Sequence, residues 1–150
     1  MPIDRLVGTT TVIASKNILI VDVDGTLCPI KSRDQSYADL TPEPRIVAKL
    51  KTLADQGWRI VIQTARGMRT YDGNAGEIAI NVAPVLLDWL RRHDIPFHEL
   101  HVAKPWAGSN GFYIDDRAVR PREFLDNTFE GLEAICRRDR LAGEGEMQDS

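Results

Sequence analysis

The sequence lacks the features that mark several specialised classes of protein. Its 150 residues include two cysteines, Cys28 and Cys136, too few for a small domain stapled by disulfides. The three histidines have no metal-ligand spacing with those cysteines, so we treat them as structural or surface residues. No apolar run approaches the ~20 residues of a membrane span, and the N-terminus shows no secretory-signal pattern. We therefore expect a cytoplasmic protein with reduced thiols and no membrane partner.

Neither sign of charge dominates the chain. A net charge of −3 gives no general attraction to nucleic acid or to an anionic membrane, so a phosphate-bearing substrate must be held by local cations. The hydrophobic fraction of 43% and the charged fraction of 27% are ordinary for a globular domain, and 150 residues suffice for one core. We predict a single domain over residues 1–140, followed by a frayed polar tail at 141–150.

Alternating apolar runs and amphipathic segments predict an α/β fold. The apolar runs predict core strands at Ile18–Val23, Trp58–Gln63, Phe97–Val102 and Phe112–Ile114. Helical spacing predicts a helix capped by Thr41 and stopped by Gly57, one around residues 85–94, a turn from Pro121 and a last helix over residues 129–140. We expect a loop or small hairpin at residues 68–80, and either an edge strand or a loose arm at residues 9–13.

The order of these elements favours a parallel sheet. A strand, a helix and a second strand in succession imply a right-handed crossover between parallel strands. We therefore predict a three-layer, doubly wound, mostly parallel sheet of the Rossmann-like type. Ligands of such folds bind at the carboxyl ends of the strands.

The segment Asp22-Val23-Asp24-Gly25-Thr26, at the end of the first predicted strand, carries the main chemical signal. Side chains two positions apart on a strand share a face, so Asp22 and Asp24 can reach one small volume. Two carboxylates that close repel each other unless a cation or a proton lies between them. The segment therefore predicts a metal site, a protonated acid, or both.

Other predicted strands end in residues that complete a site for phosphoryl transfer. Thr64, Lys104 and the pair Asp115-Asp116 follow strands whose ends meet at one edge of a parallel sheet. Asp22 can attack phosphorus, and Asp24 can protonate the leaving oxygen and later deprotonate water. The Thr64 hydroxyl and the Lys104 ammonium can bind phosphate oxygens.

The predicted metal is Mg²⁺, which prefers hard oxygen ligands. We expect Asp22, Asp24 through its backbone carbonyl, and Asp115 to bind it, with Asp116 as a second ligand or an orienting acid. The expected substrate-binding residues lie after the first and second strands. They are Gly25, Thr26, Ala65, Arg66, Arg69, Tyr71 and Asn74.

These motifs closely resemble the four motifs of the haloacid dehalogenase superfamily. Asp22 to Thr26 is similar to its Asp-x-Asp-Gly-Thr motif, and Thr64, Lys104 and Asp115-Asp116 are similar to the later three. The resemblance covers about residues 18–124, and it implies a phosphatase because an Asp at the position of Asp24 distinguishes phosphatases and phosphomutases from dehalogenases. The intervals between the motifs leave no room for a cap domain, so the chain resembles the capless members, whose sites are covered by loops, a neighbouring subunit or the substrate.

A narrower resemblance involves small phosphatases of capsule and polysaccharide biosynthesis. It rests on Thr64 to Met68, Tyr71 to Asn74, Lys104 to Trp106 and Tyr113 to Ala118. Related members act on small sugar or polyol phosphates. The combined prediction is a Mg²⁺-dependent phosphomonoesterase that hydrolyses a small sugar or polyol phosphate through an aspartyl-phosphate.

Other functions stay open at this stage. One alternative is a phosphotransferase or mutase, and another is a phosphatase for a nucleotide or macromolecular phosphate. A third, of another class, is a non-catalytic binding domain or a phospho-acceptor module. Response-regulator receivers also use Asp, Mg²⁺, Thr and Lys, but their acidic pair precedes the phosphorylated Asp, whereas Asp115-Asp116 comes last here.

Overall fold

The computed structural model describes residues 16–141 and 143, and the chain divides into two compact units. The first unit ends at Trp106 and the second begins at Ala107. The Thr-rich stretch at residues 9–13, predicted as an edge strand or an arm, lies outside the described residues. Most of the predicted tail at 141–150 lies outside them as well. The single domain over residues 1–140 stays a prediction.

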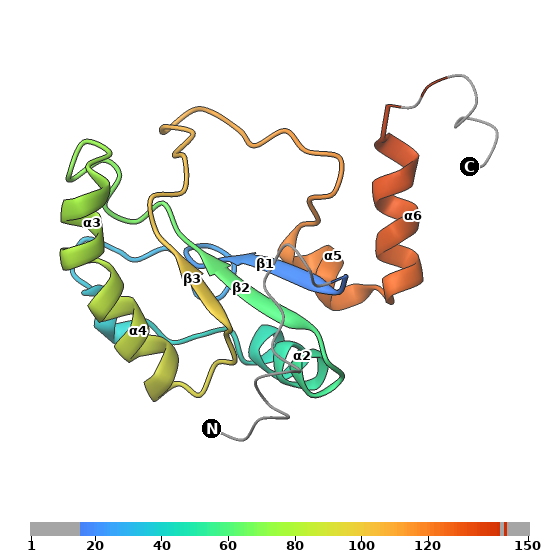
Figure 1. The fold of residues 1–150 in the computed structure, drawn as a ribbon, viewed down its shortest axis with the longest axis horizontal. Coiled ribbons are helices and arrows are strands. Elements are labelled where there is room, and N and C mark those ends of the chain that lie inside the picture. Colours follow the sequence, from blue (N-terminus) through green and yellow to red (C-terminus); the bar gives the residue numbers. More distant parts are fainter. Residues whose placement is uncertain (1–15, 142, 144–150) are drawn as a thin grey trace. The chain divides into compact units, whose positions relative to one another are not determined.

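A parallel sheet forms the centre of the first unit. Its strands are β1 (Ile18–Asp22), β2 (Arg59–Gln63) and β3 (Glu99–His101), in the order β1-β2-β3. Asp22 pairs with Gln63 and Gln63 with His101, so the carboxyl ends of all three strands lie level at one edge (Figure 1). The α/β class and the first three predicted strands are confirmed.

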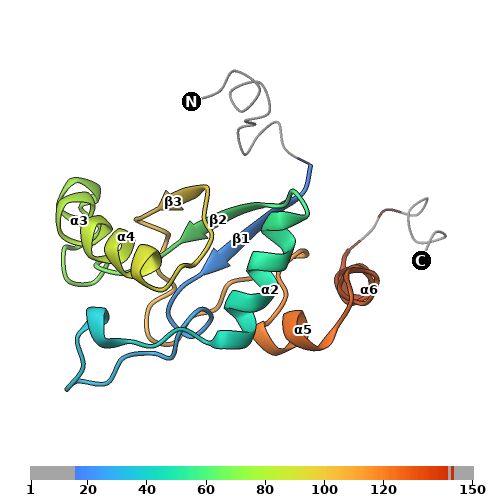
Figure 2. The same ribbon diagram turned by 90° about the horizontal axis from the view of Figure 1, so that it is seen from below.

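Helix α2 (Pro44–Asp55) connects β1 to β2 and buries Ile46, Leu50 and Leu53. The prediction that Thr41 caps this helix is wrong, because Glu43 is the N-cap and its carboxylate accepts a hydrogen bond from the Arg45 amide. A residue before proline is pushed out of the helical region, so Pro44 forces the boundary at Glu43. Figure 2 shows α2 beside β1 and β2.

Two helices, α3 (Ala75–Asn81) and α4 (Ala83–Arg92), connect β2 to β3 and lie on the β3 side of the sheet (Figures 1 and 2). Helix α4 was predicted, and its Leu86, Trp89 and Leu90 are fully buried. Val85, on the same helix, is 42% exposed. The predicted loop at 68–80 is wrong over its second half, where α3 forms.

The loop after β1 carries a single turn of 3-10 helix, η1 (Tyr37–Asp39), and is attached to α4. The Trp89 indole N–H donates to the Leu40 carbonyl at 2.7 Å, and Arg92 donates to the Ala38 carbonyl at 3.2 Å. Leu40 is itself buried. These contacts hold Tyr37 in place against the rest of the first unit.

The second unit contains the helices α5 (Pro121–Asp126) and α6 (Phe129–Asp139), both of which were predicted. The predicted fourth strand at Phe112–Ile114 is wrong: these residues have no strand structure, and their side chains are 85%, 55% and 98% exposed. A strand needs a neighbouring strand for its backbone hydrogen bonds, and the described part of this unit contains none. Among the described helices of the chain, none is long and apolar enough to span a membrane.

Candidate functional site

The turn after β1 holds the two acids of the motif. The Val23 carbonyl accepts hydrogen bonds from the amides of Thr26, Leu27 and Cys28, and the Gly25 amide donates to the Cys28 carbonyl at 2.7 Å. Gly25 has a φ of +87°, which glycine adopts without steric cost. Because Val23 and Leu27 are fully buried, the turn is fixed to the core at both ends.

Asp22, the last residue of β1, contacts two donors with its two oxygens. The Lys104 ammonium lies 3.3 Å from Oδ1, and the Thr26 hydroxyl lies 3.3 Å from Oδ2. The Asp22 side chain is 33% exposed, so it stays accessible from solvent, whereas the Lys104 side chain is 14% exposed. A partly enclosed carboxylate beside a fixed cation is suited to receive an anionic group.

Backbone pairing beyond the strands places Lys104 beside Asp22. The Thr64 amide donates to the His101 carbonyl, and the Lys104 amide donates to the Thr64 carbonyl, each at 3.0 Å. Ala103 between them has a φ of +61°, the left-handed region that non-glycine residues rarely adopt. Thr64 and Lys104, predicted from separate strand ends, are therefore joined directly.

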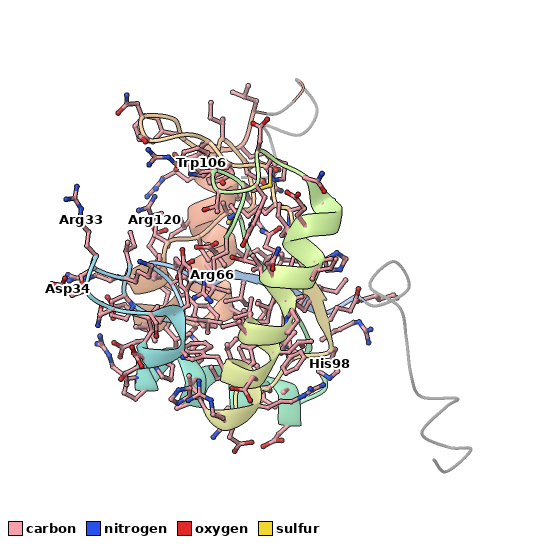
Figure 3. The ribbon with its side chains drawn as sticks, turned by 90° about the vertical axis from the view of Figure 1, so that its left-hand side faces the viewer. Arg33, Asp34, Arg66, His98, Trp106 and Arg120 are labelled. Atoms are coloured by element: carbon pink, nitrogen blue, oxygen red, sulfur yellow. The ribbon has the colours of Figure 1, made fainter. Side chains whose placement is uncertain are left out.

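Asp24 forms a two-pronged ion pair with Arg66. Nε and Nη2 of Arg66 donate to the two Asp24 oxygens, both at 2.9 Å, and the Arg66 side chain is 2% exposed. The Arg66 Cζ lies over the Tyr37 ring, 3.9 Å from the ring centroid. Figure 3 shows Arg66 in the interior, while Arg33 and Asp34 project outward from the loop. Tyr37 was not predicted for this site, and no local sequence signal links it to Arg66.

Thr64, two residues before Arg66, is almost fully buried. Its hydroxyl accepts a hydrogen bond from the Arg66 amide at 3.1 Å, which leaves its own O–H proton to donate elsewhere. The same hydroxyl therefore fixes the turn that carries Arg66. Thr64 has both a structural contact and a donor that a ligand could use.

Two further groups near Asp24 titrate abnormally. Burial, together with the charge of Asp24, raises the pKa of the Cys28 thiol to about 11. Burial and the same charge also raise the pKa of Tyr37, against an opposing effect of Arg66. Both side chains therefore stay neutral around pH 7, and Cys28 has the character of an inert structural thiol.

The remaining predicted substrate-binding residues have different surroundings. Asn74 caps α3 by accepting a hydrogen bond from the Glu77 amide at 3.0 Å, and Arg69 is exposed. Ala65 follows Thr64 and is half-buried. Tyr71 lines a cavity of about 150 Å³ to which Arg66 and Tyr37 also contribute.

The second acidic pair lies in the second unit and has its own partners. Asp115 accepts a hydrogen bond from the Arg117 amide at 2.8 Å, and Asp116 pairs with Arg140 at 2.8 Å. Desolvation acts to raise the pKa of Asp116, but the hydrogen bonds with Arg140 and Asp115 and the charge of Arg140 together outweigh it and lower that pKa. Among the described residues, no three His, Cys, Asp or Glu side chains gather as a ready metal site. The metal set of Asp22, Asp24, Asp115 and Asp116 stays a prediction.

Comparison with known proteins agrees with the α/β class. No model of a known protein family matches the chain, and no curated protein matches it. The crystal structure of an MCSG target from Vibrio cholerae is similar, with 43% sequence identity and a TM-score of 0.78, over 83% of this chain and 99% of that one. The fold is therefore that of an α/β protein with a parallel sheet. The chain belongs to the same family as the Vibrio cholerae protein, whose name states neither an activity nor a ligand.

Proposed function

We propose that this chain is a Mg²⁺-dependent phosphomonoesterase of the haloacid dehalogenase superfamily, acting through an aspartyl-phosphate on Asp22. The observation that carries the proposal is the surroundings of that carboxylate. It is partly exposed at the end of β1, has the Lys104 ammonium at 3.3 Å, and shares a fixed turn with a second carboxylate, Asp24. A nucleophile, a cation for phosphate oxygens and a candidate proton carrier thus lie in one unit.

Each group then has a role in a two-step reaction. In the first step an Asp22 oxygen bonds to phosphorus, the bond from phosphorus to the leaving oxygen breaks, and Asp24 gives that oxygen its proton. In the second step water attacks the phosphorus, Asp24 takes its proton, and the aspartyl bond breaks. Lys104 and the Thr64 hydroxyl stabilise the charge on the phosphoryl oxygens.

Asp24 and Arg66 favour one protonation state in this cycle. Both Asp24 oxygens accept hydrogen bonds from Arg66, which is the arrangement of an unprotonated carboxylate. This is the form that the second step uses. In the first step Asp24 must carry a proton, so one of the two hydrogen bonds from Arg66 has to loosen when substrate binds.

The oxygen atoms around Asp22 fit a hard divalent cation. The Asp22 carboxylate is partly exposed, and the Asp24 carbonyl is a second hard oxygen in the same turn. We assign Mg²⁺ to these two atoms, with Asp115 and Asp116 as the further proposed ligands. When bound, the ion would neutralise charge on the phosphoryl oxygens.

The proposal extends to the finer features of the fold and the substrate. We propose a three-layer, doubly wound core without a cap domain, a cytoplasmic location and a small sugar or polyol phosphate as substrate. The support is the motif set read from the sequence, together with the loop-lined surroundings of Asp24 and Arg66. An open site of this kind can be covered by a second copy of the chain.

Replacement of the nucleophile tests the proposal. Asp22→Asn should lower kcat for an aryl phosphate by about 10³-fold or more, and EDTA should remove wild-type activity until Mg²⁺ is restored. Asp34→Asn is the matched control, because Asp34 is an exposed acid in the neighbouring loop (Figure 3). An Asp22→Asn variant with wild-type turnover would rule out the aspartyl-phosphate mechanism.

A further inference from the structure

A small cavity is lined in part by Arg66, the partner of Asp24, and has no role in the two-step reaction proposed for Asp22 and Asp24. Its volume is about 150 Å³. The residues around it come from η1, the turn after β2, and the region where α3 meets α4. They are Tyr37, Arg66, Gly67, Thr70, Tyr71, Asn81, Val82 and Val85.

Arg66 connects this cavity to Asp24. A guanidinium has five N–H donors, and the Asp24 pair uses one on Nε and one on Nη2. No described residue accepts a hydrogen bond from Nη1, yet no buried side-chain nitrogen or oxygen of the described residues lacks a partner. Nη1 therefore has access to open space, and the cavity that Arg66 lines provides it.

The other walls combine apolar surface with a few polar groups. The Tyr37 ring lies over the guanidinium, and Val82 and Val85 contribute aliphatic surface. A Cβ added at Gly67 would lie 2.8 Å from Val82 Cγ2 and 3.1 Å from Tyr71 Cδ2, so glycine is needed where these side chains approach the backbone. Such a lining suits a short carbon chain that carries hydroxyl or carbonyl oxygens.

We propose that this cavity binds the leaving group of the substrate, with Arg66 donating from Nη1 to one of its oxygens. This inference rests on the proposed function, because it requires Asp24 to be the acid that protonates the leaving oxygen. A cavity of ~150 Å³ holds about as much as a benzene molecule, or about six non-hydrogen atoms. The cavity therefore matches the leaving group of a short polyol phosphate, such as glycerol phosphate, better than the larger leaving group of a nucleoside monophosphate.

The cavity can be filled from its exposed side. Thr70 is exposed and lines the cavity, so Thr70→Phe should occupy the space without disturbing the core. We expect kcat/KM for glycerol 3-phosphate to fall at least 10-fold, and kcat/KM for acetyl phosphate, whose leaving group is smaller, to stay within two-fold. Thr52→Phe, at an exposed threonine on α2, should change neither.

The possible results distinguish a failure of the proposed function from a failure of the role assigned to the cavity. A wild-type protein that hydrolyses neither phosphate would overturn the proposed function. Normal hydrolysis of glycerol 3-phosphate by Thr70→Phe, or equal losses on both substrates, would overturn the assignment of the cavity alone. Turnover of adenosine monophosphate by the wild type as fast as glycerol 3-phosphate would do the same. Val85→Phe, at another partly exposed lining residue, repeats the test if Thr70→Phe does not fold.

Discussion

The two acidic turns of this chain, one at Asp22 and Asp24 and the other at Asp115 and Asp116, differ in what holds them. In the first, the carboxylates pair with Lys104 and Arg66, cations from distant parts of the same unit. In the second, Asp115 bonds to a backbone amide only two residues away, and Asp116 pairs with Arg140. Similar acidic sequences thus give one turn whose two carboxylates pair with largely buried cations and one in which a single carboxylate pairs with a cation that is 40% exposed.

The difference follows from the strand that precedes each turn. β1 is paired along its whole length with β2, so Asp22 is placed by the register of the sheet. The segment before Asp115 has no strand structure and exposes its apolar side chains. A carboxylate gains a fixed geometry from such a motif only where the backbone before it is itself fixed.

The largest expected contrast involves one glycine in each unit. Gly67→Ala should lower the free energy of unfolding by about 2–4 kcal/mol, because the added Cβ meets Val82 at 2.8 Å and the φ is +82°. Gly108 has a φ of +75° but nothing within 4 Å, so Gly108→Ala should cost about 1 kcal/mol. Urea unfolding followed by circular dichroism measures both, and equal losses would contradict the contrast.

Removal of the buried cation should have the next largest effect. Arg66→Ala leaves Asp24 without its partner and should cost about 2–3 kcal/mol, somewhat less than a fully buried pair because the Asp24 side chain is 25% exposed. The same urea titration measures this loss. A cost below about 0.5 kcal/mol, the level of a solvent-exposed pair, would show that the pair is open to solvent.

A smaller effect should appear as a dependence of stability on pH. The pKa of Cys28 is about 11 in the folded chain against 9.0 ordinarily, so between these values the unfolded chain releases a thiol proton that the folded chain keeps. The free energy of unfolding should therefore fall as pH rises from 9 to 11, by up to about 2 kcal/mol. Cys28→Ala should flatten this part of the profile, and an unchanged slope in that variant would refute the assignment.

The smallest effect is expected in the second acidic turn. Arg140→Ala removes the partner of Asp116, but the two side chains are 40% and 50% exposed, so the loss should stay below about 1 kcal/mol. A loss as large as that of Arg66→Ala would mean that the two turns are equally anchored. Thermal unfolding of the two variants side by side gives the comparison directly.

Features encoded by neighbouring residues were predictable from the sequence. β-Branched runs located β1 and β2, the predicted strand at Phe97–Val102 contained β3, and helical spacing located α2, α4 and α6. Since these strands are parallel, their order along the chain was enough to place Asp22, Thr64 and Lys104 at one edge. The hydrogen bonds of Lys104 to Asp22 and to the Thr64 carbonyl agree with this placement.

Other features depend on contacts between distant residues or on weak local signals. Helix α3 is short and contains Gly76, features typical of a loop, although Asn74 followed by Glu77 at the third helical position is a capping signal. The apolar run at Phe112–Ile114 cannot be distinguished from an extended loop by composition, since pairing decides between them. The stacking of Tyr37 on Arg66 joins two loops, and no periodicity encodes it.

The left-handed backbone of Ala103 affects which residues position 103 can accommodate. A left-handed alanine beside Lys104 stores conformational energy, of order 1 kcal/mol, that a glycine would release. The same glycine would widen the range of directions open to the lysine side chain. Ala103→Gly should therefore stabilise the fold but orient the Lys104 ammonium less firmly beside Asp22.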